Sequence, residues 1–155
     1  MDKAKASGVS ELRSHIGFWL RLVSNHVSHA FTRKLLDSGA TAAEWVVLRE
    51  MYDRGDMSPS VLADLTGMTR GAASKLIDRL VGKQLISRQE NSDDRRYQDI
   101  ELTALGRQLV PALAAIADQN DEEFFAPLSL EEREALVATL EHLAVAHGLR
   151  KMPTE

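Results

Sequence analysis

The sequence of 155 residues predicts a mainly α-helical protein that carries one small β-hairpin. Apolar residues recur at intervals of three and four over most of the chain, which is the helical period. Alternation of apolar and polar residues is confined to two short segments with a polar turn between them. The composition, 44% hydrophobic and 27% charged, is typical of a globular chain. Its length predicts a single domain over residues 1–155.

The first predicted helix spans Ser10 to about Leu36. At 1.5 Å per residue it would reach about 40 Å, which is longer than the core of a domain of this size requires. A helix of that length is therefore expected to lean on a second chain. Its apolar stripe consists of Ile16, Leu20, Val23, Val27 and Phe31.

The next predicted helices begin at recognisable capping residues. Thr41, followed three residues later by Glu44, forms a capping box that opens a helix through Tyr52. The side chains expected to face inward on this helix are Trp45, Val46, Leu48 and Met51.

A short helix and a longer one follow, joined by a tight turn. Ser58 is an N-cap with Pro59 at the first helical position, and this short helix is expected to end near Leu65. After the turn at 66–68, which contains a glycine, helical spacing returns from Thr69 to about residue 83. Two helices joined in this way form a helix-turn-helix.

The hairpin and two more helices complete the chain. Residues 85–90 and 98–102 alternate as strands around a polar tip at 91–96. Thr103 caps a fifth helix, and Ser129 with Glu132 forms a second capping box that opens a last helix ending near Gly148. The predicted fold class is thus a winged helix-turn-helix flanked by long helices.

The charge distribution singles out the middle of the chain. The net charge is −4 overall, but it is 0 over residues 1–67, +3 over 68–98 and −7 over 99–155. Only the middle is expected to meet an anionic polymer such as DNA. There, small, hydroxyl and cationic side chains open the second helix of the helix-turn-helix, and Asp94 can orient Arg96 on the hairpin tip. The alternative for the helix start is an ordinary exposed first turn, and the alternative for the hairpin tip is a solvated run of charges.

These segments resemble the multiple-antibiotic-resistance regulator (MarR) family of bacterial winged-helix repressors. The resemblance rests on residues 68–80, Leu85-Ile86, the run 94–96, Leu102-Thr103 and Gly106. It implies a homodimer held by helices at 10–37 and 104–148, while a cytoplasmic location is expected from the lack of a secretory signal and of a membrane-spanning run. A lobe at 41–103 would bind a palindromic double-stranded DNA operator, and a small, often aromatic or phenolic anion would release it. The expected DNA-binding residues are Ser58, Thr69, Arg70, Gly71, Ala72, Ser74, Lys75, Arg79, Asp94, Arg95 and Arg96.

The chain departs from the family pattern at two places. Gln84 stands where the family usually has glycine, so this helix needs a different cap or a left-handed Gln84. Gln98 and Asp99 are polar where apolar residues are commoner, which leaves the packing of the second wing strand open.

An effector site is expected at the first helix and at Trp45. His15, Trp19 and His26 share a helical face with Leu22 and His29. This stripe is interpreted first as a dimer seam with partly exposed histidines, and otherwise as a pocket for an aromatic carboxylate or a metal site. Trp45 is interpreted first as a core residue and second as a ligand contact. The expected ligand-binding residues are His15, Trp19, His26 and Trp45, with no metal ligand assigned.

Other classes of function find little support in the sequence. Cysteine is absent, which removes thiolate chemistry and disulfides. No phosphate loop, His-Glu-x-x-His or Gly-x-Ser-x-Gly motif occurs, so neither an enzyme nor a cofactor is expected. No secretory signal or membrane-spanning run is found. The acids at 121–123 and 131–134 are interpreted as favourable charges at helix starts. A winged-helix protein-interaction module and a histidine-based metal-responsive regulator are the remaining alternatives.

Overall fold

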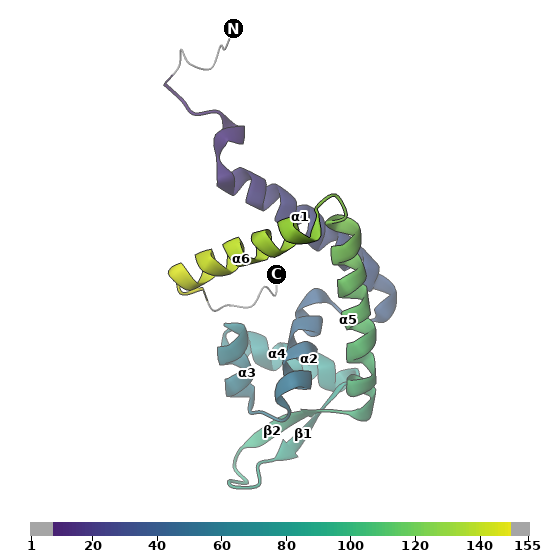
Figure 1. Ribbon diagram of the computed structural model, residues 1–155. Helices are drawn as coiled ribbons and strands as arrows, with labels where there is room; N and C mark the ends of the chain where they lie inside the picture. Colours follow the sequence, from purple (N-terminus) through teal and green to yellow (C-terminus); the bar gives the residue numbers. More distant parts are fainter. Residues whose placement is uncertain (1–7, 150–155) are drawn as a thin grey trace.

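The predicted fold class is confirmed by the computed structural model, which describes residues 8–149 (Figure 1). Residues 1–7 and 150–155 lie outside the described part, so a single domain over residues 1–155 stays a prediction. Two 3₁₀ turns flank the first helix, η2 (Leu12–Ser14) and η3 (Leu36–Ser38). The remaining elements are α1 (Ile16–Leu35), α2 (Ala42–Arg54), α3 (Pro59–Thr66), α4 (Arg70–Gly82), β1 (Ile86–Glu90), β2 (Gln98–Leu102), α5 (Ala104–Phe124) and α6 (Leu130–Ala146).

The start predicted for the first helix, at Ser10, is wrong. The chain makes the single turn η2, becomes extended at His15 (φ −88°, ψ 125°) and enters α1 only at Ile16. Local side-chain bonds compete with the helix here, because Ser14 Oγ donates to the Glu11 carbonyl at 2.7 Å and His15 Nδ1 lies 3.0 Å from the same oxygen. Ile16 is 76% exposed, so the chain itself provides no packing that would extend the helix backwards.

The other helix starts agree with the predicted caps. The capping boxes at Thr41 and Ser129 are both complete, with each N3 glutamate bonded back to the cap residue. Ser58, Thr69 and Thr103 each accept a hydrogen bond from the backbone N–H of the third residue after them. Each cap satisfies one backbone donor that the first helical turn cannot pair internally.

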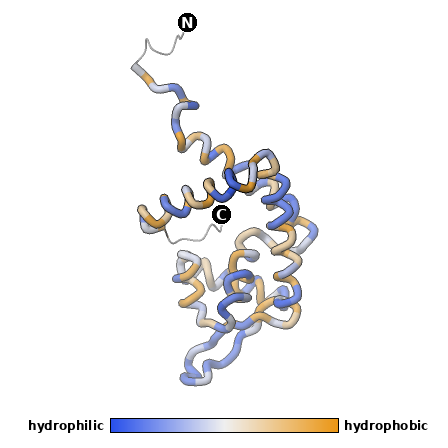
Figure 2. The backbone as a smooth tube through the Cα atoms, in the orientation of Figure 1, coloured by the Kyte–Doolittle hydropathy of each residue, from blue (hydrophilic) through white to orange (hydrophobic). Residues whose placement is uncertain are grey.

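A core of aliphatic side chains lies where α2, α3, α4 and the hairpin meet the lower part of α5 (Figures 1 and 2). Leu48 and Met51 of α2 are fully buried, as predicted, but Val47 is buried more completely than Val46 or Trp45. The inward face of α2 is broader than one stripe because the helix contacts α1, α5 and β2. In the described residues, no helix is long and apolar enough to cross a membrane.

The hairpin is attached to the core through both strands, since Ile86 of β1 and Ile100 of β2 belong to the buried cluster. β1 and β2 are antiparallel, with Ile86 opposite Leu102, and Ile100 pairs with Met57 through two further backbone hydrogen bonds. Ile100 is fully buried, which compensates for the polar departures in the same strand. Gln98 is exposed and Asp99 accepts a hydrogen bond from Asn91 at 2.7 Å.

Gln84, two residues after the end of α4, is in the left-handed conformation, with φ at 60°. Among residues 8–149 it is the one residue other than glycine with positive φ, so the second of the two predicted solutions is correct. Its carbonyl accepts a hydrogen bond from Thr103 Oγ1 at 2.6 Å, which ties this turn to the start of α5.

A buried ion pair joins the start of α2 to the end of α4. Glu44 is fully buried, and its Oε2 accepts hydrogen bonds from the Thr41 amide at 2.9 Å and from Lys83 Nζ at 2.8 Å. Lys83 also donates to the Gly39 carbonyl at 2.7 Å. A carboxylate that is removed from water needs such partners to stay charged.

Replacement of Gln84 by glycine should stabilise the protein, because glycine adopts positive φ without the steric cost that other residues incur. We expect the free energy of unfolding, measured by urea titration, to rise by about 0.5–1 kcal/mol. Gly39→Ala is the control, since φ is 77° there and the added methyl meets open space. It should lose about 1 kcal/mol, and an unchanged stability in both variants would contradict the strain argument.

Lys83→Met should destabilise the protein by about 3 kcal/mol, because it leaves a buried carboxylate without its cation. The value lies at the lower end of the usual range because the Lys83 side chain is 39% exposed. Arg54→Met is the control, since it removes an exposed pair with Glu50 and should cost less than about 0.5 kcal/mol. Equal urea midpoints for the two variants would show that the buried pair contributes no more than a surface one.

Candidate nucleic-acid interface

One face of α4 is exposed while the opposite face packs into the core. Ala73, Leu76, Ile77 and Leu80 are buried. The predicted contact residues of this helix alternate with them on the outer face, so the structure leaves all of them accessible. These exposed residues are Thr69, Arg70, Gly71, Ala72, Ser74, Lys75 and Arg79.

Two of the predicted hydroxyl contacts also cap helices. Thr69 Oγ1 accepts from the Ala72 amide at 3.1 Å, and Ser58 Oγ accepts from the Val61 amide at 3.2 Å. A hydroxyl that accepts one hydrogen bond can still donate its own hydrogen. Both positions therefore offer a donor to an anion at a helix N-terminus, where the helix dipole is also favourable.

On the hairpin tip, Asp94 holds the side chain of Arg96 in place. Asp94 receives hydrogen bonds from Arg96 Nε at 3.0 Å and from its terminal nitrogen at 2.7 Å, and the carboxylate also accepts from the Arg96 amide at 3.1 Å. These bonds lower the pKa of Asp94 and raise the pKa of Arg96. Asn91 Oδ1 in turn accepts from the Asp93 and Asp94 amides. Arg96 stays 85% exposed, and Arg95 beside it is exposed as well.

A second ion pair sets the hairpin against α4. Arg88 on β1 donates to Asp78 on the exposed side of α4. Across the hairpin, Ser87 and Gln89 both donate to Glu101. The strands and the helix are thus held by polar contacts outside the core, and the tip extends beyond the rest of the fold (Figure 1). This surface can present cations and hydroxyls to a polyanion from two directions.

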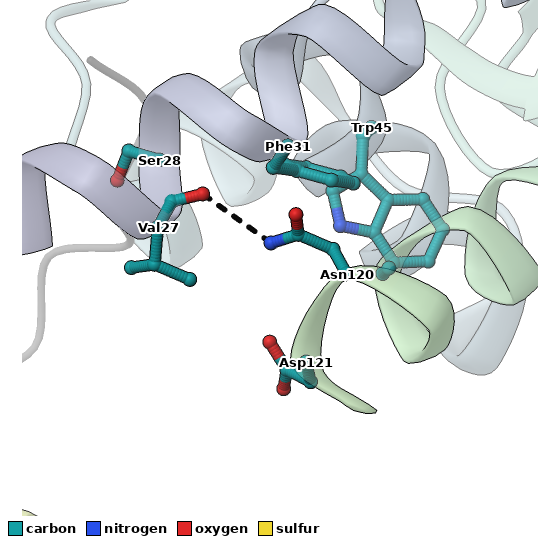
Figure 3. A pocket seen from close by; sticks show the side chains of 7 residues that line it. Val27, Ser28, Phe31, Trp45, Asn120 and Asp121 are labelled. Atoms are coloured by element: carbon teal, nitrogen blue, oxygen red, sulfur yellow. Dashed lines mark hydrogen bonds between the residues drawn. The ribbon is translucent and has the colours of Figure 1, made fainter. Parts of the chain in front are cut away.

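A hollow of about 240 Å³ lies between α1, α2 and α5, and we call it the α1–α2–α5 hollow (Figure 3). Trp45, one of the expected ligand contacts, lines it. The Asn120 side chain, which is buried, donates to the Val27 carbonyl at 3.3 Å and accepts from Lys34 Nζ at 3.2 Å. The other lining residues include Val27, Ser28 and Phe31 of α1 and Asp121 of α5.

The other three expected ligand contacts do not line this hollow. His15 precedes α1, so it does not share a helical face with Trp19 and His26, and the predicted stripe is wrong at its first residue. Trp19 Nε1 donates to the Arg13 carbonyl at 2.8 Å, and His26 is exposed. No group of three or more metal-ligating side chains occurs within residues 8–149.

The interpretation of the acids at 121–123 as a helix start is wrong. These residues form the last turn of α5, where negative charge opposes the helix dipole. Glu122 pairs with Arg133 at 2.7 Å and Glu123 with Lys34 at 2.8 Å, and each pairing lowers the pKa of the glutamate. Partial burial and the nearby Asp118 raise the pKa of Asp121. The predicted start at Ser129 is correct for the second acidic group.

Asn120 and Asp121 are functional candidates that the sequence interpretation missed. The available signal was Asn120 itself, a polar residue that continues the apolar stripe of Leu113 and Ile116 along α5. A polar residue on a core-facing stripe needs hydrogen-bond partners, and those partners come from α1, which is far away in the sequence.

Comparisons with known proteins agree on one family. A family model described as "MarR family" matches residues 40–97. Transcriptional regulator HosA of Escherichia coli O157:H7 is 29% identical over 97 residues, which is 63% of this chain and 72% of HosA. A probable transcriptional regulator from Pseudomonas aeruginosa shares 30% identity and a TM-score of 0.77, with 86% of this chain and 99% of that one covered. BpsR of Bordetella bronchiseptica, whose DNA binding is regulated by 6-hydroxynicotinic acid, shares 28% identity and a TM-score of 0.78, with 88% and 98% covered.

Arg96→Ala should raise the pKa of Asp94 toward the ordinary aspartate value of about 3.9. The rise is partial because the Arg96 backbone amide remains a donor. The folded pKa is depressed, so the pair is present at neutral pH and is lost as the pH falls through that value. Carboxyl-carbon NMR titration measures it, with Arg95→Ala as the matched control that should change nothing. The same Asp94 pKa in both variants would mean that Arg96 does not hold the carboxylate in solution.

Proposed function

The chain belongs to the MarR family of transcriptional regulators, and we propose that it is a homodimeric repressor of a palindromic operator that a small molecule releases. The observation that carries this proposal is the lobe at 41–103, which presents the exposed face of α4 together with the Asp94-held Arg96. An α-helix fits the major groove of DNA, and an arginine on a narrow tip fits the minor groove.

Each contact residue has a role that its chemistry supports. Arg70, Ser74 and Lys75 would reach base edges or phosphates from α4, where the small Gly71 and Ala72 permit a close approach. Hydroxyls and first-turn amides would bind phosphate oxygens, and exposed cations beside them would add charge. The phosphate-contacting set comprises Ser58, Thr69, Arg79 and Arg95, while Asp94 positions Arg96 and makes no contact of its own.

The dimer is proposed to form through the helices at 10–37 and 104–148. Large apolar side chains lie exposed along α1 and α6, including Ile16 at 76%, Leu130 at 73% and Val145 at 81%. Exposed large apolar side chains in such number on two helices are typical of a protein–protein interface. Two-fold pairing would place the two α4 helices about 34 Å apart, one turn of DNA.

The α1–α2–α5 hollow is the proposed effector site, because it joins a helix of the proposed dimer arms to a helix of the lobe. A molecule that binds more tightly to the form whose two lobes are not spaced for DNA shifts the population away from the DNA-bound form. Each tenfold preference for that form supplies about 1.4 kcal/mol of coupling. The regulation of BpsR by a small aromatic acid supports an effector of some kind for this chain.

The test is a titration of the purified protein against its own upstream intergenic DNA and against unrelated DNA, at two salt concentrations. We expect two chains per site, a preference of about 10³ or more for the upstream DNA, and weakening with salt. Binding without salt dependence, or equal binding to both DNAs, would contradict operator recognition and favour a protein-interaction module.

Arg96→Ala should weaken operator binding about tenfold and reduce the slope of log affinity against log salt by about 1. The fold should be unchanged because the side chain is exposed. Arg54→Ala, at an exposed arginine of α2 outside the proposed contacts, is the matched control and should leave affinity and slope within about twofold of the unmodified protein. Equal losses in both variants would remove the wing from the mechanism.

A further inference from the structure

The last turn of α5 carries three consecutive acids where the helix dipole disfavours them. Arg133 neutralises Glu122 and Lys34 neutralises Glu123. Asp121 has no ion pair and no side-chain hydrogen bond to any residue between 8 and 149, and its backbone carbonyl accepts a hydrogen bond from the Phe125 amide. Asp121 is exposed and carries an unneutralised negative charge at a helix C-terminus, so a cation brought by a ligand would find a favourable position beside it.

Asp121 lies at the edge of the α1–α2–α5 hollow, whose other side carries two aromatic rings (Figure 3). Phe31 comes from α1 and Trp45 from α2, and both project toward the space beside Asn120. Aromatic faces attract cations through the quadrupole of the ring, most strongly for tryptophan. A carboxylate opposite aromatic rings combines the two features that stabilise an organic ammonium group.

The hollow offers little to an anion. Of the residues that line it, none is cationic. Lys34 is nearby, but its ammonium group already serves Glu123 at 2.8 Å and Asn120 at 3.2 Å. The Asn120 amide group is itself committed to the Val27 carbonyl. A bound carboxylate would therefore face Asp121 without a charged donor of its own.

We propose that the α1–α2–α5 hollow takes a ring-bearing organic cation, an amine or quaternary ammonium, between Phe31, Trp45 and the Asp121 carboxylate. This inference rests on the proposed function, because it assigns a chemical class to the effector of that site. It replaces the aromatic or phenolic anion that the family resemblance implies for this chain. The reason is the charge of the residues that line the hollow. The position of the hollow in the fold does not determine this charge.

The test uses three probes with the same phenyl ring: benzyltrimethylammonium, phenylacetate and benzyl alcohol. The full chain is labelled with ¹⁵N, and the indole N–H signal of Trp45 is followed, with Trp19→Phe identifying the other tryptophan. Benzyltrimethylammonium should shift the Trp45 signal with an affinity at least about fivefold above that for phenylacetate. The neutral alcohol should lie between them.

Asp121→Asn should reduce affinity for the cation about fivefold and improve binding of phenylacetate. Asp118→Asn is the matched control, because it removes the same charge one turn earlier on α5 at a residue that does not line the hollow. It should change the affinity for the cation by less than about twofold. Asp121 is exposed and its side chain has no partner among residues 8–149, so Asp121→Asn should leave the fold unchanged, and the amide spectrum checks this directly.

Three results would overturn the inference: no Trp45 shift with the cation, equal or tighter binding of phenylacetate, or equal effects of the two aspartate variants. Operator binding is measured separately by fluorescence polarisation with the same three probes. Loss of operator recognition in the unmodified protein would defeat the proposed function, whatever the indole signal shows. Operator binding that phenylacetate releases and the cation does not would defeat the cation inference alone.

Discussion

The buried carboxylate of Glu44 is the constraint on which the geometry of the lobe depends. It is fully excluded from water, and its charge is compensated by the Thr41 amide and by Lys83, which also bonds to the Gly39 carbonyl. An isolated charge in this position would cost several kcal/mol, so the end of α4 must stay where Lys83 can reach it. One side chain thereby joins the turn before α2, the first turn of α2 and the end of α4.

The residues that follow Lys83 connect this ion pair to the wing. The next residue, Gln84, takes the left-handed turn, and its carbonyl is bonded by Thr103 at the start of α5. Gly106 then passes so close to Leu85 that a Cβ atom at this glycine would lie 2.2 Å from the Leu85 carbonyl oxygen. The end of α4, the hairpin and the start of α5 therefore form one closely packed junction. This packing fixes the exposed face of α4 relative to the wing, so in the proposed dimer an effector would change the spacing between two lobes more easily than the geometry within one.

α2 contacts both this junction and the α1–α2–α5 hollow. Glu44 faces Lys83, whereas its neighbour Trp45 lines the hollow with Phe31 and Asn120. Occupancy of the hollow would press on the same helical turn that bears the buried ion pair. The acids at the end of α5 give the hollow its charge, since two of them are neutralised within the chain and Asp121 is not. The proposed effector site and the lobe proposed to bind DNA thus share one helix and differ in electrostatic character.

The sequence by itself determined the local features of this protein. Capping residues at Thr41, Ser58 and Ser129, the alternation of the two strands and the motif around Asp94 and Arg96 depend on neighbours a few residues away, and all of these local contacts were predictable. The requirement for a special conformation at Gln84 followed from a single unexpected residue type. The helical spacing of apolar residues did not locate the start of α1. A helix would continue past His15 only if other segments packed against it, and the local sequence does not specify that packing.

Only the tertiary structure decided which residues form the hollow and which acids are neutralised. Trp45 meets Asn120 and Val27 across intervals of about 75 and 20 residues, and Lys34 reaches Glu123 across about 90. The acids at 121–123 would be favourable at a helix start, but they are unfavourable here because they form the last turn of α5. Electrostatic energy depends on distance in space, and only the folded chain specifies which charges are close together.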